Sequence, residues 1–161
     1  MQPGDVLLFR RRGVFNWTIE HATNAPVSHS EVFVGPLERP GLAHTAACRN
    51  GVGVNFYPLE LEGLAVILRP KRPFDLEAAL AYQRSVIGQG YDWSGLWRAF
   101  VRNTWGRNSV KQWCSENSTL VQRAGGIEPF APDCPADMIA PGHFLTSAAY
   151  FHLWKVDGFP I

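Results

Sequence analysis

Short runs of apolar and β-branched residues, each ended by Gly, Pro or Asn, occupy most of the first half of the chain. They predict strands over residues 5–10, 30–34, 42–46, 52–57 and 64–68. Between the first two strands, Phe15, Ile19 and Ala22 recur at helical spacing and predict a short helix over 15–23. The last four strands are joined by short polar turns, which is typical of an antiparallel meander.

After the P-K-R-P segment the apolar period changes from that of strands to that of helices. Residues 75–87 form an amphipathic pattern with Asp75 at the N-cap position, and a second helix is predicted over 93–102. A third helix begins near Cys114 and stops at Gly125 and Gly126. A single turn after Pro135 and a last strand over 148–156 complete an α+β arrangement, with about five to six antiparallel strands packed against helices.

Composition supports one ordered domain over residues 1–161. The chain has 46% hydrophobic residues and 12% aromatic residues, enough to build a sizeable core. Its net charge of +1 gives no electrostatic reason to expect nucleic acid as a partner. One basic cluster stands out, Arg10-Arg11-Arg12, and it is interpreted either as a solvated turn or as a grip on an anionic substrate or membrane surface.

The chain lacks the signals of several other protein classes. Three cysteines without a C-x-x-C pair indicate neither a disulfide framework nor a zinc ribbon. Motifs of serine hydrolases and nucleotide-binding loops are missing, so no cofactor is predicted. No secretory leader and no membrane-spanning run is seen, which makes the cytoplasm the expected compartment, with release by lysis or by a phage also open. The oligomeric state is not predicted.

Cys114 is the strongest candidate for chemistry. It stands where a helix begins, and unpaired N–H groups and the helix dipole favour a thiolate there. Its neighbours Gln112, Ser115 and Glu116 are polar, whereas a packed cysteine more often lies in an apolar run. Simple burial remains the alternative interpretation.

Two histidines could serve such a thiolate. His29 is at the entry of a predicted strand, where its ring can project into a cleft, although a capping or surface role is also open. His44 lies in the next predicted strand, and we expect strand pairing to bring it beside His29 and orient that ring. His44 could otherwise be a half-buried strand residue. The three groups include possible metal ligands, but no local H-x-x-x-H pair accompanies them, so no metal site is predicted.

The order of these segments resembles a known family, the circularly permuted branch of the NlpC-type papain-like cysteine peptidases. It is most similar to the YiiX/YaeF-like group and more distantly to lecithin:retinol acyltransferase-like proteins. The resemblance rests on the segments G-D-V-L-L-F, S-H-S-E-V-F-V-G, A-H-T-A, G-Y-D and W-C-S-E, taken in this order. Because the histidine precedes the cysteine, the order is the permuted one, and a permuted papain-like fold is implied.

The resemblance implies a role for each matching residue. Cys114 would be the nucleophile, His29 the general base and His44 the third polar residue. The expected substrate-side residues are Tyr91, Asp92, Trp113, Ser115 and Glu116, and Glu116 could serve only to hold the helix start.

Three functions follow as hypotheses. The first is a cysteine amidase or peptidase that cleaves a small amide, with cell-wall peptides as the family-typical substrate. The second is an acyltransferase or a lipid-ester or thioester hydrolase, slightly favoured by His44 and by Trp93, Trp97 and Trp105, although a core position is the better interpretation of these tryptophans. The third is a non-catalytic binding or phage-associated module that keeps the fold.

Overall fold

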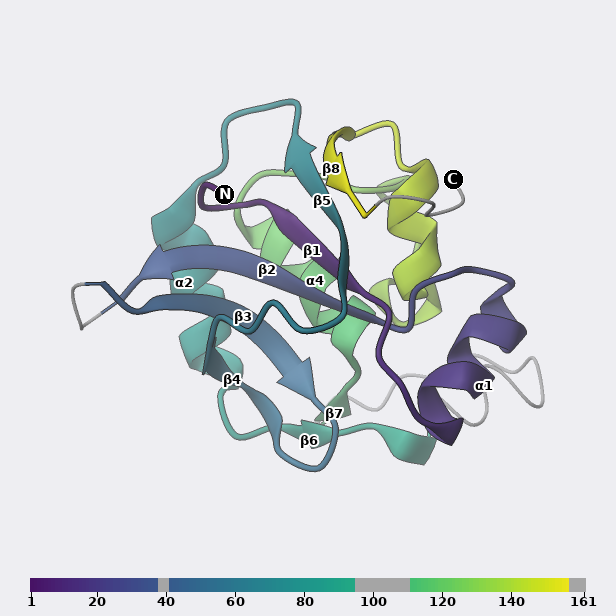
Figure 1. Cartoon of the computed structure of the whole chain (residues 1–161). Coiled ribbons are helices and arrows are strands. Elements are labelled where there is room, and N and C mark those ends of the chain that lie inside the picture. The colour runs from purple at the N-terminus through teal and green to yellow at the C-terminus, as the bar shows by residue number, and fades with distance from the viewer. Residues whose placement is uncertain (38–40, 95–110, 157–161) are drawn as a thin grey trace.

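The computed structural model describes residues 1–37, 41–94 and 111–156. Six strands form one antiparallel sheet in the order β4-β3-β2-β1-β5-β8 (Figure 1). The strands are β1 (Val6–Phe9), β2 (His29–Pro36), β3 (Ala43–Arg49), β4 (Gly53–Pro58), β5 (Leu64–Pro70) and β8 (Tyr150–Lys155). The α+β prediction and its number of strands are confirmed, while the papain-like permutation stays a prediction.

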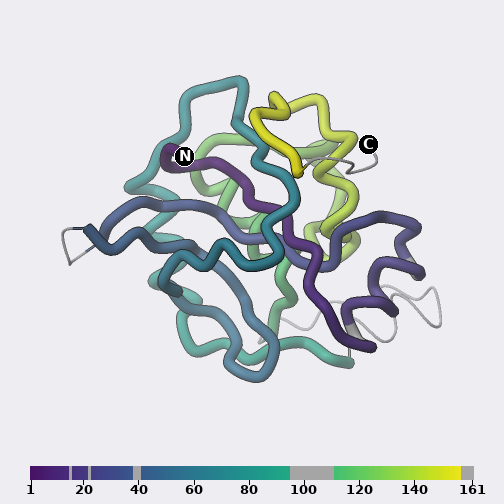
Figure 2. The backbone as a smooth tube through the Cα atoms, viewed as in Figure 1, coloured from purple at the N-terminus to yellow at the C-terminus, as the bar shows by residue number. Residues whose placement is uncertain are grey.

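The four consecutive strands do not form the single meander that their turns suggest. β2, β3 and β4 pair in sequence, but β5 pairs with β1 instead of β4. The reason lies in β1, whose four residues V-L-L-F are completely buried on both faces. A strand that is apolar on both faces is stable only inside a sheet. Figure 2 shows this N-terminal strand between segments that come later in the chain.

Alternation along the strands divides the core between the two faces of the sheet. On one face Val32, Val34 and Ala46 pack with helical residues, among them Leu80 and Val121. On the other face Leu7, Phe9 and Phe33 form a separate cluster. In the middle of β2, Val32 and Val34 therefore face the helices, and Phe33 faces away from them.

Two helices cover the first of these faces. α2 (Leu76–Val86) begins at Asp75, whose carboxylate accepts a hydrogen bond from the Ala78 amide, as the sequence predicted. α4 (Cys114–Ala124) ends at Gly125, again as predicted. The two helices contact each other, and α4 contacts β2 and β3 (Figure 1).

The remaining elements are short. α1 (Val14–Thr23) follows β1, and two 3-10 helices, η1 (Ala136–Met138) and η2 (Pro141–Thr146), lead into β8. β6 (Gly90–Tyr91) and β7 (Lys111–Gln112) form a two-stranded parallel pair that the sequence did not predict. The helix predicted over 93–102 lies mostly outside the described residues. Within the described ranges, every helix is too short or too polar to cross a membrane.

Candidate active site

Cys114 is the first residue of α4, as predicted, and only 2% of it is exposed. The preceding residue, Trp113, has extended backbone, so the chain turns from β7 directly into the helix. The Trp113 amide donates to Glu116 Oε2 at 3.4 Å, which caps the first turn. The sequence therefore folds into a strand–helix corner with the thiol at the helix start.

The buried side of α4 is polar. Eight of its eleven residues are buried, and six of these are Ser, Glu, Asn, Thr or Gln. Asn117 Nδ2 donates to both Gln83 Oε1 and Gln112 Oε1, at 3.1 and 2.9 Å. Ser30 Oγ donates to Ser118 Oγ at 3.0 Å, and Gln122 Nε2 donates to the Gly4 carbonyl at 2.8 Å. These directional contacts fix the position of the helix on the sheet, and with it the position of Cys114.

His29 is the first residue of β2, and its side chain is buried. Its Nε2 donates to Glu31 Oε1 at 2.9 Å. Cys114 lies close enough to the ring to raise the pKa of His29 through its charge and through hydrogen bonding. Because Nε2 is occupied by Glu31, Nδ1 is the nitrogen available to the thiol. The structure thus brings together the two residues that the sequence predicted as a pair.

Glu31 is the third member of the cluster, and it is fully buried. Thr45 Oγ1 donates to its Oε2 at 2.6 Å. Arg49 donates Nε to Oε1 at 2.8 Å and Nη2 to Oε2 at 3.1 Å, a bidentate pairing. Arg11 Nη2 adds a longer contact to Oε1 at 3.3 Å. With His29, four residues surround one carboxylate, and this is how a buried charge is normally stabilised.

Positive and negative groups alternate through this cluster, and their pKa values shift accordingly. Burial alone would raise the pKa of Glu31, but His29 and then Arg49 outweigh it and lower that pKa far below its ordinary range. Burial would likewise lower the pKa of His29, yet Cys114 and then Glu31 raise it to about 9. Burial raises the pKa of Cys114, but His29 and backbone hydrogen bonds from Ser30 and Ser115 give a net decrease. The favoured state is a thiolate–imidazolium pair.

His44 does not take the position predicted for the third polar residue. His44 lies in β3 and pairs with Gly35 of β2. Gly35 is six residues along β2 from His29, a separation of about 20 Å in an extended strand. The two histidines lie at opposite ends of the hairpin, because β2 and β3 are connected near His44 and His29 is at the far end. His44 Nδ1 is buried without a hydrogen-bond partner among the described residues. Glu31 replaces it beside His29.

The predicted substrate-side residues divide into two groups. Trp113 Nε1 and Ser115 Oγ both donate to the Ile139 carbonyl, so these side chains anchor η1 and do not line a pocket with His29. Glu116 caps the helix as described above. Asp92 is buried and accepts from Ser94 Oγ at 2.9 Å.

Tyr91 is the predicted substrate-side residue that does lie at the pocket. Its side chain lines the same pocket as His29, and Cys114 is close enough to influence the pKa of its hydroxyl. Burial, followed by the charge of Cys114, raises the pKa of Tyr91 well above its ordinary value. The phenol therefore keeps its proton and can donate.

The pocket above this cluster has a volume of about 480 Å³. Its lining comes from the β1–α1 connection, from α1 itself, and from the entry of β2, the β3–β4 region and β6. The lining residues are Arg11, Asn16, Ser28, His29, Arg49, Asn50, Val52, Tyr57 and Tyr91. Polar side chains predominate, so the pocket suits a polar ligand.

The other two cysteines differ from Cys114. Cys48 is buried in β3 and donates its S–H to the Gln112 carbonyl at 3.0 Å. Burial, with the nearby Cys114 charge as the next cause, raises the pKa of Cys48 far above its ordinary value. Cys134 is half-buried and lies outside the cluster. Cys114 is the one described cysteine that contacts an imidazole.

Comparison with known proteins identifies a similar fold. The crystal structure of the metalloprotein yiiX from Escherichia coli O157:H7 superposes with a TM-score of 0.72, and the alignment covers 99% of this chain and 98% of that chain. Sequence identity is 18%, so the likeness shows the fold alone. It supports the YiiX-like part of the resemblance. No protein-family model matches the sequence, and no curated protein is detectably similar to it.

Proposed function

We propose that the protein is a cysteine-dependent hydrolase that cleaves a small amide or peptide bond. The observation that carries the proposal is the series Cys114–His29–Glu31, in which His29 donates to the Glu31 carboxylate while His29 and Cys114 shift each other's pKa toward the charged forms. A nucleophile, a base and a group that orients the base are the parts that covalent acyl chemistry requires. A purely structural cysteine has no need of this arrangement.

The chemistry follows from the charge state of the pair. The Cys114 thiolate attacks the amide carbonyl, and the imidazolium of His29 gives its proton to the departing amine as the C–N bond breaks. The thioester is then attacked by water, which loses a proton to His29 while the C–S bond breaks. N–H groups at the start of α4 and the Tyr91 hydroxyl are placed beside the sulfur, where they can stabilise the developing oxyanion.

Of the features that favoured acyl transfer, the position of His44 no longer supports it. His44 lies far from His29, with Glu31 in its place. Trp97 and Trp105 lie outside the described residues, and Trp93 packs against Tyr91 with ring centroids 5.1 Å apart. Hydrolysis of an amide is therefore the function that we propose.

Because the neighbour yiiX is a metalloprotein, the candidate site must be compared with the requirements of a metal centre. Within the described ranges, no group of three His, Cys, Asp or Glu residues is arranged to hold a metal ion. Glu31 already accepts from two arginines, a histidine and a threonine, which leaves little capacity for a metal bond. The residues do not fit a metal centre, and no step of the mechanism uses one.

Alkylation by iodoacetamide across pH tests the nucleophile directly. Peptide mass analysis resolves the three cysteines, so Cys134 serves as an internal comparison within the same sample. We expect Cys114 to react with a midpoint well below about pH 8.5, the ordinary pKa of a free thiol. A Cys114 that reacts no faster than Cys134 at pH 6–7 would overturn the proposal. Turnover of an amide panel by wild type and by Cys114→Ser then establishes whether the reactive thiol is catalytic.

A further inference from the structure

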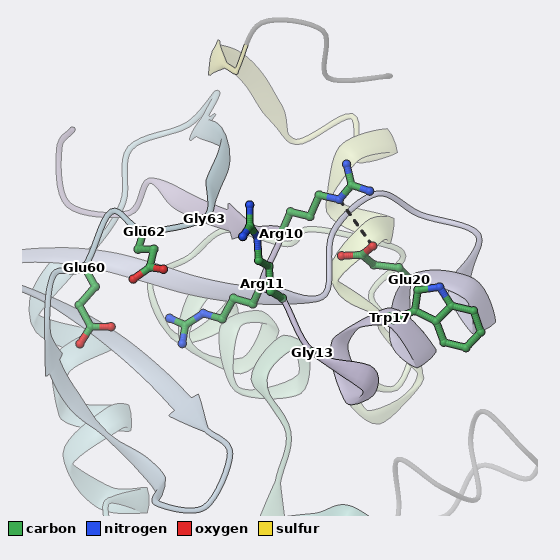
Figure 3. A pocket seen from close by; sticks show the side chains of 9 residues that line it. Arg10, Arg11, Gly13, Trp17, Glu20, Glu60, Glu62 and Gly63 are labelled. Carbon is green, nitrogen blue, oxygen red and sulfur yellow. Dashed lines mark ion pairs between the residues drawn. The ribbon is translucent and has the colours of Figure 1, made fainter.

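A second, larger pocket adjoins the His29 pocket and shares Arg11 with it. Its volume is about 970 Å³. Figure 3 shows the arginines of the β1–α1 connection between the glutamates before β5, on one side, and Trp17 and Glu20 of α1, on the other. The lining residues are Arg10, Arg11, Arg12, Gly13, Trp17, Glu20, Glu60, Glu62 and Gly63. The basic cluster of the sequence thus lies beside the candidate active site.

The guanidinium of Arg11 is only partly used by its contact with Glu31. Glu31 is already paired with Arg49 through two short hydrogen bonds, so the 3.3 Å contact of Arg11 is a second cation on one carboxylate. Its guanidinium lies 5.3 Å from the Phe9 ring centre, and 31% of its side chain is exposed. An arginine that is held in place by an aromatic ring and is only partly paired is suited to bind a carboxylate in bidentate fashion.

The acidic residues of the larger pocket provide the complementary charge. Glu20 pairs with Arg10 at 3.6 Å, and Glu60 pairs with Arg49 at 3.1 Å. Glu62 has no ion-pair partner among the described residues. The pocket therefore presents two cations with free binding capacity, the partly paired Arg11 and Arg12, and one anion, Glu62, without an ion pair among the described residues, while Trp17 is its single large apolar side chain. Of the two arginines, Arg11 is the one that also lines the His29 pocket.

The geometry points to a dipolar substrate: a peptide or amino-acid-derived amide whose carboxylate is bound by Arg11 and whose ammonium group is bound by Glu62. This inference rests on the proposed function, which supplies the amide. It excludes acyl lipids as the preferred class, because three arginines and three glutamates would be desolvated by an alkyl chain without compensation.

Binding to an inactive variant tests the inference without turnover. In a Cys114→Ala background, calorimetric titration would compare trialanine with free ends, its N-acetyl form, its C-terminal amide and octanamide. We expect trialanine to bind most tightly, and each capped form to bind at least about tenfold more weakly, since each has lost a charge-assisted contact. Equal affinity for all peptides, no binding of trialanine, or tighter binding of octanamide would overturn the inference.

Charge-neutralising variants assign the two contacts. Arg11→Gln should weaken trialanine but leave the C-terminal amide unchanged, and Glu62→Gln should weaken trialanine but leave the N-acetyl form unchanged. Arg84→Gln on the exposed side of α2 is the matched control and should alter none of these affinities. If Arg11→Gln disturbs the fold, Glu62→Gln still decides, because Glu62 does not contact the Cys114–His29–Glu31 cluster. An equal effect of Glu62→Gln on trialanine and on its N-acetyl form would refute the assignment.

The outcome separates this inference from the proposed function. Alkylation of Cys114 tests the nucleophile without reference to either pocket. A reactive Cys114 combined with charge-independent peptide binding would refute only the dipolar substrate. An unreactive Cys114 would refute the hydrolase while leaving the binding result to stand by itself.

Discussion

Replacing Glu31 with Gln keeps the size of the side chain but removes a charge that four residues share. Arg49 loses a bidentate carboxylate partner while its side chain is only 12% exposed, and Thr45 and His29 lose short hydrogen bonds. Removing one partner of a buried ion pair costs about 3–5 kcal/mol. We expect a loss near the lower end, about 3 kcal/mol, since Arg49 can still pair with Glu60.

The same substitution should weaken the nucleophile. Glu31 supports the imidazolium of His29, which in turn lowers the pKa of Cys114. In Glu31→Gln the pKa of His29 falls and that of Cys114 rises. Because the ring also loses the group that orients it, the rate of hydrolysis should drop by about 10²–10⁴.

Acid unfolding provides a third measurement, with a defined sign. The folded-state pKa of Glu31 is lowered from an ordinary 4.5, so its contribution to stability is complete above about pH 4.5 and is lost as pH falls toward the folded value. The variant lacks this group. We therefore expect the difference in unfolding free energy between wild type and Glu31→Gln to shrink steadily below about pH 4.5.

Urea unfolding and iodoacetamide labelling over pH 3–9 make these measurements. Glu128→Gln is the control, because the Glu128–Arg123 pair at 2.9 Å is partly exposed and should contribute no more than about 1 kcal/mol. That variant should leave the labelling of Cys114 unaltered. If Glu31→Gln labels Cys114 with the wild-type pH profile, the role of Glu31 in the pair is refuted, whatever its effect on stability.

Three further predictions concern other parts of the molecule. His44→Gln should leave the alkylation profile of Cys114 unchanged, whereas His29→Gln should shift its midpoint up toward the value of a free thiol; equal effects of both would restore His44 to the site. The value of kcat/KM should rise with pH as the thiolate forms and fall near pH 9 as His29 loses its proton, so a profile still rising at pH 10 would contradict the ion pair. Gly125→Ala should lower the unfolding free energy by about 1–3 kcal/mol, because the added Cβ would overlap the Phe74 ring, and a wild-type urea midpoint would contradict this packing.

The sequence predicted the helix start at Cys114 and the strand entry at His29 because both signals are local. Glu31 could have been found in the same way. His29 and Glu31 are two residues apart in a strand, and strand alternation places such side chains on one face. A polar pair of this spacing inside an apolar strand has to find partners when buried, which is a signal of function.

Other features depended on contacts that sequence patterns do not encode. The position of His44 follows from the length and register of the β2–β3 hairpin, which the sequence signals fix only loosely. The burial of α4 is also a tertiary effect, since its polar residues are stabilised by distant groups such as Gln83 and the Gly4 carbonyl. The pairing of β5 with β1 is a tertiary effect as well, because β1 is buried on both faces and needs a neighbour on each side.

The arginines explain why a charged pair can exist in so dry a position. For both Cys114 and His29, burial is the largest single influence on the pKa, and by itself it favours the neutral forms of both groups. Cys114 and then Glu31 reverse this for His29, but a lone buried carboxylate would be protonated in turn. His29 and then Arg49 keep it ionised. The reactivity of the thiol therefore depends in part on Arg49, which acts on Glu31 and not on the sulfur itself. A sequence search confined to nucleophiles and bases would pass over this arginine.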